Sequence, residues 1–136
     1  MNLNLQYLLD TNIISELVRN PQGIIKDRIA VIGEDAICTS IIVSSELHFG
    51  VEKKGSNRLR NQLETILSAL VILPLEEPAD RQYAVLRSNL EKTGTPVGPN
   101  DMLIAAQAIS LGLTLVTANI REFSLVQGLA VENWLE

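Results

Sequence analysis

The sequence predicts an α/β fold with a central, mainly parallel sheet. Short apolar segments alternate along the chain with segments in which apolar residues recur at helical spacing, and this alternation is typical of parallel sheets. Hydrophobic residues make up 46% of the chain and aromatic residues only 4%, as expected for an aliphatic α/β core. The length of 136 residues, without a repeat or linker, predicts a single domain over residues 1–136.

The first half of the chain begins with a strand that ends at an acid. Asp10 follows an apolar run, and Thr11 then supplies the capping chemistry of a helix start. Asp10 is therefore expected at the carboxyl end of a strand, the edge at which ligands bind in parallel sheets. The elements expected in this half are a strand at 3–9, helices at 13–18 and 24–32, a strand at 35–39 and a helix capped by Ser40 that runs to about residue 53.

The second half continues the alternation. Asn57 is expected to cap a helix, Pro78 to open a second, and Pro99 to open a third that ends at Gly112. The strands expected here are 71–75, 113–117 and 128–131, and Trp134 is expected to cover the core.

Four polar side chains are expected to meet at one edge of the sheet. Asp10 and Asn119 end the first and fourth strands, while Glu46 and Asp101 lie on helices that approach the same edge. Asp101 alone is also explained as a residue that caps its helix and complements the helix dipole. Together, three carboxylates and an amide favour a hard cation such as Mg²⁺ or Mn²⁺. Such a site predicts hydrolysis of a phosphodiester by an activated water.

Glu46 is the second acid on an apolar helix face. Spacing puts it on one face with Ile42, Phe49 and Gly50. The alternative is that Glu46 lies at the edge of the apolar stripe and reaches water.

The composition excludes several other kinds of site. Cys38 is the only cysteine, so the chain has no intrachain disulfide and no thiolate metal site, which favours a reducing compartment. The single His48 cannot supply a His-rich zinc site, and a Ser-His-Asp site needs more than it offers. No apolar run approaches the roughly 20 residues of a membrane span, and the N-terminus lacks the pattern of a secretion signal. A cytoplasmic protein is expected.

The net charge of −5 argues against binding nucleic acid by bulk charge alone. A local basic run remains, and it is either an RNA-binding patch or a solvated face. Its members are Lys53, Lys54, Arg58 and Arg60.

Four motifs, in order, resemble those of the PIN domain, and more narrowly those of the VapC-type toxins of bacterial toxin–antitoxin pairs. They are Leu8-Leu9-Asp10-Thr11-Asn12, Ser45-Glu46-Leu47 with Gly50, Gly98-Pro99-Asn100-Asp101 with Ile104-Ala105-Ala106, and Val116-Thr117-Ala118-Asn119 with Arg121-Glu122-Phe123. The resemblance implies a three-layer α/β/α sandwich and an endoribonuclease, dependent on Mg²⁺ or Mn²⁺, that acts on tRNA or other RNA. By position, Asp10, Glu46 and Asp101 match the acidic triad of the family, with Asp10 and Asp101 as the principal metal ligands.

The family often has a fourth acid where this chain has Asn119. An amide carries one negative charge less, so a second metal is expected to bind poorly or only with substrate, unless Glu122 substitutes. The resemblance also implies a homodimer and a partner antitoxin of the VapB type, whose C-terminal segment places an Arg or Lys against the acids.

Two other classes of function are weighed. A phosphotransfer domain with Asp10 as nucleophile would need either a late lysine, whereas the last is Lys92, or a second aspartate where the chain has Asn12. The other alternative is a weak or inactive PIN-like module that only binds a partner protein or RNA. The missing fourth acid favours it, and the three acids present argue against it.

Overall fold

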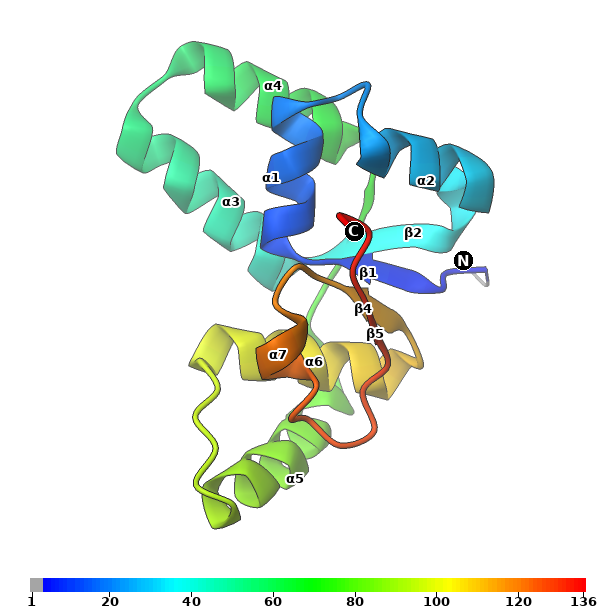
Figure 1. Ribbon diagram of the computed structural model, residues 1–136. Helices are drawn as coiled ribbons and strands as arrows, with labels where there is room; N and C mark the ends of the chain where they lie inside the picture. The colour runs from blue at the N-terminus through cyan, green and yellow to red at the C-terminus, as the bar shows by residue number, and fades with distance from the viewer. Residues whose placement is uncertain (1–3) are drawn as a thin grey trace.

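A five-stranded sheet lies between two groups of helices (Figure 1). The computed structural model describes residues 4–136. The strands are β1 (Tyr7–Leu9), β2 (Ile37–Ser40), β3 (Val71–Leu73), β4 (Thr114–Val116) and β5 (Val131–Glu132). The helices are α1 (Thr11–Arg19), α2 (Ile24–Ile32), α3 (Ile41–Lys54), α4 (Asn57–Ser68), α5 (Ala79–Lys92), α6 (Pro99–Leu111) and α7 (Ile120–Phe123). The group α1–α4 covers one face, and α5–α7 cover the other.

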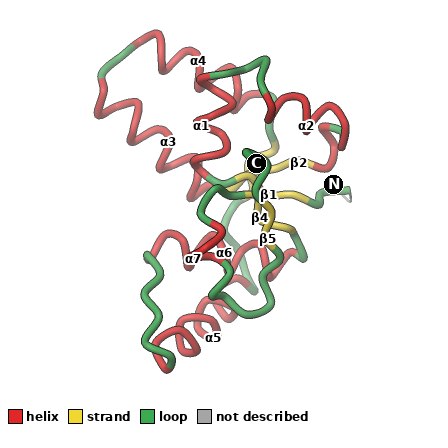
Figure 2. Tube along the Cα trace, viewed as in Figure 1, coloured by secondary structure: helices red, strands yellow, loops and turns green. Residues whose placement is uncertain are grey.

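The sheet has the strand order β3-β2-β1-β4-β5, and every neighbouring pair is parallel. This confirms the predicted fold class. All five expected strands form, but they are shorter than predicted, as the yellow segments of Figure 2 show. The second strand begins only at Ile37 because Glu34–Ala36 form a 3₁₀ turn, and the last begins at Val131 rather than Gly128. Leu3, at the start of the predicted first strand, lies outside the described residues.

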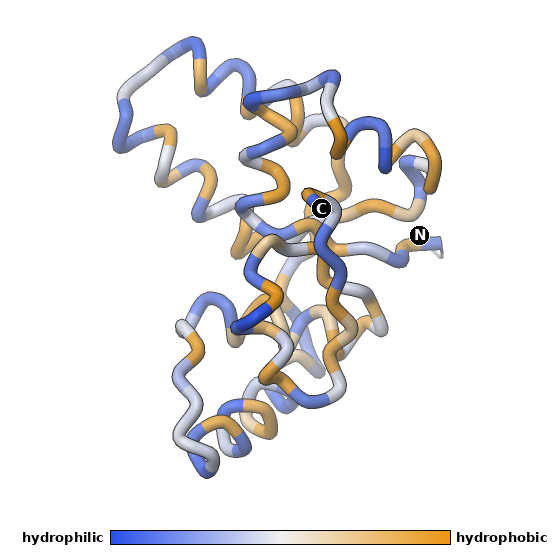
Figure 3. The backbone as a smooth tube through the Cα atoms, in the orientation of Figure 1, coloured by the Kyte–Doolittle hydropathy of each residue, from blue (hydrophilic) through white to orange (hydrophobic). Residues whose placement is uncertain are grey.

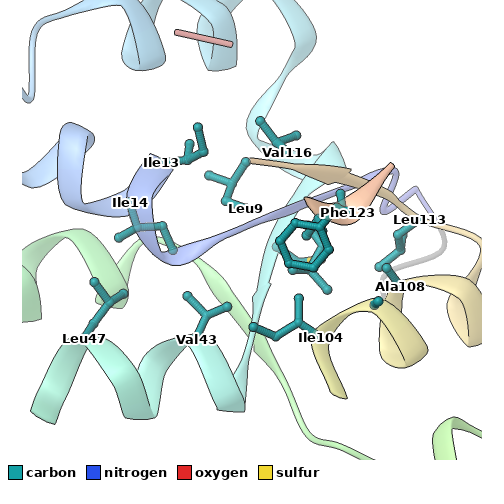
Figure 4. Packing of buried hydrophobic residues seen from close by; sticks show 14 of the residues in the cluster. Leu9, Ile13, Ile14, Val43, Leu47, Ile104, Ala108, Leu113, Val116 and Phe123 are labelled. Carbon is teal, nitrogen blue, oxygen red and sulfur yellow. The ribbon is translucent and has the colours of Figure 1, made fainter. Parts of the chain in front are cut away.

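The core surrounds β1, the central strand, and its neighbour β4, where hydrophobic segments converge (Figure 3). Leu8 and Leu9 of β1 and Val116 of β4 are fully buried, as expected for strands covered on both faces. Figure 4 shows side chains from both helical groups packing around them, including Ile14 from α1 and Ile104 from α6. The predicted cover by Trp134 is confirmed, since this residue is 1% exposed.

Two helix starts follow the capping chemistry of the sequence, and two differ from it. The Ser40 Oγ accepts a hydrogen bond from the Ile42 N–H at 3.0 Å and so caps α3. Pro99 is the first residue of α6, and that helix ends at Gly112, whose φ of 67° is left-handed. Two predicted caps are wrong. Ser56 and not Asn57 caps α4, and Asp10 and not Thr11 caps α1.

Two predicted helix faces are wrong. Phe49 is 67% exposed, and Gly50 is exposed as well, so the face they were expected to form with Glu46 does not point into the core. The buried residues of α3 are Val43, Ser44, Leu47 and Val51. Glu46 therefore lies at the edge of the buried stripe. In α2, helical spacing predicts that Ile24, Ile25, Ile29 and Ile32 are buried. Only Ile25 is fully buried, because this helix packs on the margin of the domain.

Among residues 4–136, no helix combines the length and the apolar character needed to cross a bilayer.

Candidate functional site

Asp10 is a buried carboxylate at the carboxyl end of β1. It is 4% exposed and caps α1, where its Oδ1 accepts a hydrogen bond from the Thr11 N–H at 2.8 Å. Its Oδ2 accepts a second hydrogen bond, from the Thr117 hydroxyl, also at 2.8 Å. The strands place these residues together, because Leu9 of β1 lies in register with Val116 of β4. Parallel pairing thus brings together residues that are far apart in the chain.

The surroundings of Asp10 disfavour its negative charge. Burial raises the pKa of this carboxyl, and the charges of Glu46 and Glu122 raise it further. The hydrogen bonds from Thr117 and Thr11 lower the pKa, but burial is the largest effect, and the pKa lies above its ordinary value. A nearby cation would favour the ionised form.

Glu46 reaches the same edge from α3. Its Oε1 accepts a hydrogen bond from the Thr11 hydroxyl at 2.6 Å, and its Oε2 lies 3.5 Å from the Asn100 side-chain amide. Thr11 therefore contacts two acids, Asp10 through its backbone and Glu46 through its side chain. These contacts hold Glu46 between the N-termini of α1 and α6.

Asp101 lies in the first turn of α6, where the helix dipole favours a carboxylate. Its pKa is nevertheless raised to about 7. The causes are burial, then the charges of Glu122, Asp10 and Glu46, and finally a hydrogen bond to Glu122 that favours the protonated form. Burial and crowding by like charges together thus outweigh the helix dipole. Capping its own helix and complementing the helix dipole do not by themselves explain why Asp101 lies among other acids.

Glu122 supplies a fourth carboxylate. Its Oε2 accepts a hydrogen bond from the Asn119 side-chain amide at 2.6 Å, and its Oε1 accepts one from the Gly98 N–H at 3.1 Å. Asn119 thus holds Glu122 beside Asp101, where its charge acts on the pKa of Asp101. The signal in the sequence was the three-residue spacing of Asn119 and Glu122, which puts them on one side of a helical turn.

Three of the four acids, Asp10, Glu46 and Asp101, line an open pocket of about 410 Å³, called here the acidic pocket. Its lining residues are Asp10, Thr11, Asn12, Ser15, Arg19, Glu46, Asp101 and Asn119. All four predicted site residues are therefore present. A second, more apolar pocket of about 260 Å³ continues between α1, α3 and α4. Sequence reasoning missed Ser15 and Arg19, which line both pockets, and Thr117, which holds Asp10.

The four carboxylates do not form a ready-made metal cage. In the part of the chain that the structure describes, residues 4–136, no three Asp, Glu, His or Cys side chains are close enough to hold an ion as they stand. Mg²⁺ needs no such cage, because it usually binds through one or two carboxylates and keeps several waters. The donor set fits this mode, since it is all oxygen and carries crowded negative charge.

The basic run lies outside the acidic pocket. Lys53 and Lys54 are in the last turn of α3, and Lys54 lines the apolar pocket. Arg60 donates to the Glu52 carboxylate and to the Asn57 side-chain carbonyl, both at 2.9 Å. Arg60 is therefore the one of the four basic residues whose charged group is already engaged by neighbouring side chains.

Cys38 and His48 take no part in the acidic pocket. Burial raises the pKa of the Cys38 thiol to about 12, so it remains protonated. His48 lies on the surface, with its Nδ1 3.8 Å from a Glu64 oxygen.

The model of the PIN domain matches residues 7–129. The chain is 37% identical over 130 residues to Ribonuclease VapC2 of Rickettsia felis, and the aligned region covers 94% of this chain and 97% of that protein. It is 35% identical over 131 residues to the tRNA(fMet)-specific endonuclease VapC of Salmonella typhimurium, and the aligned region covers 96% of this chain and 98% of that protein.

Solved structures resemble the whole chain. A chain in the VapBC2 complex of Rickettsia felis, bound to a DNA fragment from its promoter, has a TM-score of 0.88 and 34% identity and covers 96% of this chain and 99% of its own. A chain in the DNA-bound VapBC complex of Salmonella typhimurium has a TM-score of 0.86 and 35% identity, with coverage of 96% and 98%.

Proposed function

The chain belongs to the PIN-domain family, in its VapC group, and on that premise we propose that it is the toxin of a type II toxin–antitoxin pair and cleaves RNA with the help of Mg²⁺ or Mn²⁺. The observation that carries this proposal is the crowding of carboxylates around Asp101, whose pKa is raised to about 7. Four acids in one place destabilise each other unless a cation neutralises them. Perturbed carboxyls in a pocket are typical of functional sites.

Asp10 and Asp101 are the proposed principal ligands of the metal, with Glu46 completing the site directly or through water. When bound, a divalent cation supplies an activated water and neutralises the charge that develops on the phosphate. Asp10 offers a fixed carboxylate, because Thr11 and Thr117 each hold one of its oxygens. The Thr11 hydroxyl fixes Glu46 in the same way.

Asn119 has an indirect role in this proposal. Its amide donates to Glu122, so it positions a carboxylate rather than supplying one. Glu122 does not take the ligand place of the family's fourth acid, because Asn119 and the Gly98 N–H hold its two oxygens and it does not line the acidic pocket. We propose that one metal binds strongly and that a second binds only with substrate. Calorimetric titration with Mn²⁺ in the absence of RNA tests this, and two tight sites would contradict it.

The proposed substrate is tRNA, because one relative is named as specific for tRNA(fMet). The proposed partner is an antitoxin of the VapB type, since the similar solved structures are VapBC complexes. A basic side chain of such a partner would compete with the metal for the acidic pocket. We further propose that the toxin is a homodimer and acts in the cytoplasm.

The proposed ribonuclease is tested with purified protein and an initiator tRNA transcript. Cleavage is expected with Mg²⁺ or Mn²⁺ and is lost with EDTA. Asp10→Ala and Asp101→Ala should abolish it, while Asp80→Ala, at an exposed acid in the first turn of α5, is the matched control and should not. Unchanged cleavage by Asp101→Ala would overturn the assignment. A wild-type protein that binds RNA or a partner but cleaves in neither metal would instead support the interaction module.

The basic run is proposed to guide RNA toward the acidic pocket. Charge reversal at Lys53, Lys54 and Arg58 should weaken RNA binding and flatten its salt dependence. Arg60 is expected to contribute less, because its guanidinium already contacts Glu52 and Asn57. Unchanged binding after the reversal would leave the run as a solvated face.

A further inference from the structure

A polar stripe on α1 lines the wall of the acidic pocket. Thr11, Ser15 and Arg19 are spaced by four residues and therefore lie on one side of the helix. All three line both the acidic pocket and the neighbouring apolar pocket. Among the described residues that line the acidic pocket, Arg19 is the only Lys or Arg. Arg19 was not predicted as a site residue, because in the sequence it follows the apolar face of α1 as an ordinary surface residue would.

The guanidinium of Arg19 is held at one nitrogen. Its Nη2 donates to the Glu16 Oε1 at 3.1 Å, and Glu16 also accepts a hydrogen bond from the Asn20 side chain. These contacts lower the pKa of Glu16 and keep it ionised. Within residues 4–136, no hydrogen bond involves the other two nitrogens of Arg19, and the side chain is 63% exposed. Arg19 is therefore oriented by Glu16 and still has donors to offer.

An oriented arginine beside four carboxylates has a clear use in binding RNA. The carboxylates repel a polyanion, so a chain of phosphates needs a cation on the wall of the pocket to approach it. The planar guanidinium fits a phosphate with two parallel hydrogen bonds. Along the axis of α1, Arg19 lies eight residues and so about 12 Å from Thr11, which holds Glu46. This offset keeps the Arg19 backbone away from the acids, so its side chain suits a nearby phosphate that does not itself react.

The competing explanation is an ordinary surface ion pair between Arg19 and Glu16. Such pairs contribute little to stability, and the chain contains another, between Arg87 and Glu91 on α5, at 3.0 Å. The two pairs differ in place. Arg87 lies on the opposite side of the sheet from α1, whereas Arg19 lines the acidic pocket. Arg87 therefore provides a matched control.

We infer that Arg19 binds the RNA phosphate next to the scissile one, with Glu16 orienting its guanidinium. This inference rests on the proposed ribonuclease function. Because the contacted phosphate does not react, its binding is equally strong in the ground state and the transition state. Loss of Arg19 should then raise KM and leave kcat nearly unchanged.

The test compares Arg19→Ala, Arg19→Lys, Glu16→Gln and Arg87→Ala in cleavage of an initiator tRNA transcript with Mg²⁺. Arg19→Ala should raise KM about ten- to hundredfold, the size of a lost charge-assisted hydrogen bond, with kcat changed less than about threefold. Arg19→Lys keeps the charge but loses the planar guanidinium that makes two parallel hydrogen bonds. Its KM should therefore lie between those of wild type and Arg19→Ala. Glu16→Gln should raise KM by a smaller factor, and Arg87→Ala should match wild type.

A binding measurement separates this inference from the proposed function. In the Asp101→Asn background, fluorescence anisotropy with the same transcript at several salt concentrations should show weaker binding for Arg19→Ala and a slope of log K against log salt smaller by about 0.7. Equal KM and binding for Arg19→Ala and Arg87→Ala would overturn the inference while wild-type cleavage stands. A fall in kcat without a rise in KM would also overturn it. If wild type does not cleave, the proposed function fails, and the anisotropy alone decides whether Arg19 binds RNA phosphate.

Discussion

Replacing Asp101 by Asn should make the metal-free protein more stable, although it removes a proposed metal ligand. The substitution keeps the shape of the side chain and removes one charge from a group of four acids. The difference between the ordinary pKa of 3.8 and the value of about 7 corresponds to about 4 kcal/mol if it is fully expressed. Asp101 is only half-buried, so solvent screening reduces the expected gain to about 1–2 kcal/mol. For a domain of this size the gain is a rise in Tm of about 4–8 °C.

The gain should depend on pH in a defined direction. The pKa of Asp101 is higher in the folded chain than in the unfolded chain, so Asp101 favours folding when it is protonated. That contribution is fully present below about pH 4 and is lost as the pH rises to about 7. The advantage of Asp101→Asn should therefore be larger near pH 8 than near pH 5.

Thermal unfolding in EDTA, followed by calorimetry at both pH values, measures this difference. The matched control is Asp80→Asn, which removes a first-turn acid from α5 and should lower Tm slightly through the helix dipole. The raised pKa of Asp101 would not reflect burial and crowding of its charge if Asp101→Asn melted at or below the wild-type temperature near pH 8. A difference that did not change with pH would refute the reasoning as well.

Three further substitutions probe the site and the core. Thr117→Val leaves the buried Asp10 carboxylate without one hydrogen bond, so the free energy of unfolding by urea should fall by about 1–3 kcal/mol; a loss below about 0.5 kcal/mol would show that this bond is dispensable. Glu122→Gln removes the largest charge effect on Asp101, so carboxyl NMR titration should give a lower pKa for Asp101, and an unshifted titration would contradict its role. Trp134→Ala should cost about 3–5 kcal/mol in the same urea assay, because the indole is fully buried; a surface-like loss would mean that the C-terminal segment does not cover the core.

Much of the fold follows from local patterns in the sequence. The extent of α6 was predictable, because Pro99 and Gly112 mark the two ends of this helix by backbone geometry alone. The place of Asp10 at a sheet edge was predictable because this residue ends an apolar strand and precedes a helix, although Asp10 itself, and not Thr11, caps that helix. The face of α3 was not predictable, because Phe49 fits helical spacing equally well on a buried or an exposed side, and only packing against α1 and α4 decides between them.

The contacts within the site depend on tertiary structure. The Thr117 hydroxyl meets Asp10 only because β4 pairs with β1, and no local pattern reports that pairing. Arg19 reaches the acidic pocket because α1 runs along its wall, which a sequence window cannot reveal. The contacts of Glu122 were predictable only in part. Its spacing from Asn119 can be read from the sequence, but its approach to Asp101 cannot.

The pairing of β1 with β4 also has a consequence for the order of synthesis. The Asp10 carboxylate leaves the ribosome long before its Thr117 partner, which lies 107 residues later. A nascent chain that ends before β4 has an unfilled edge beside β1 and an acid without its hydroxyl. Such long-range pairing forms late in folding. Chains that terminate before β4 are therefore expected to be inert, because the acidic pocket assembles only after β4 has been synthesised.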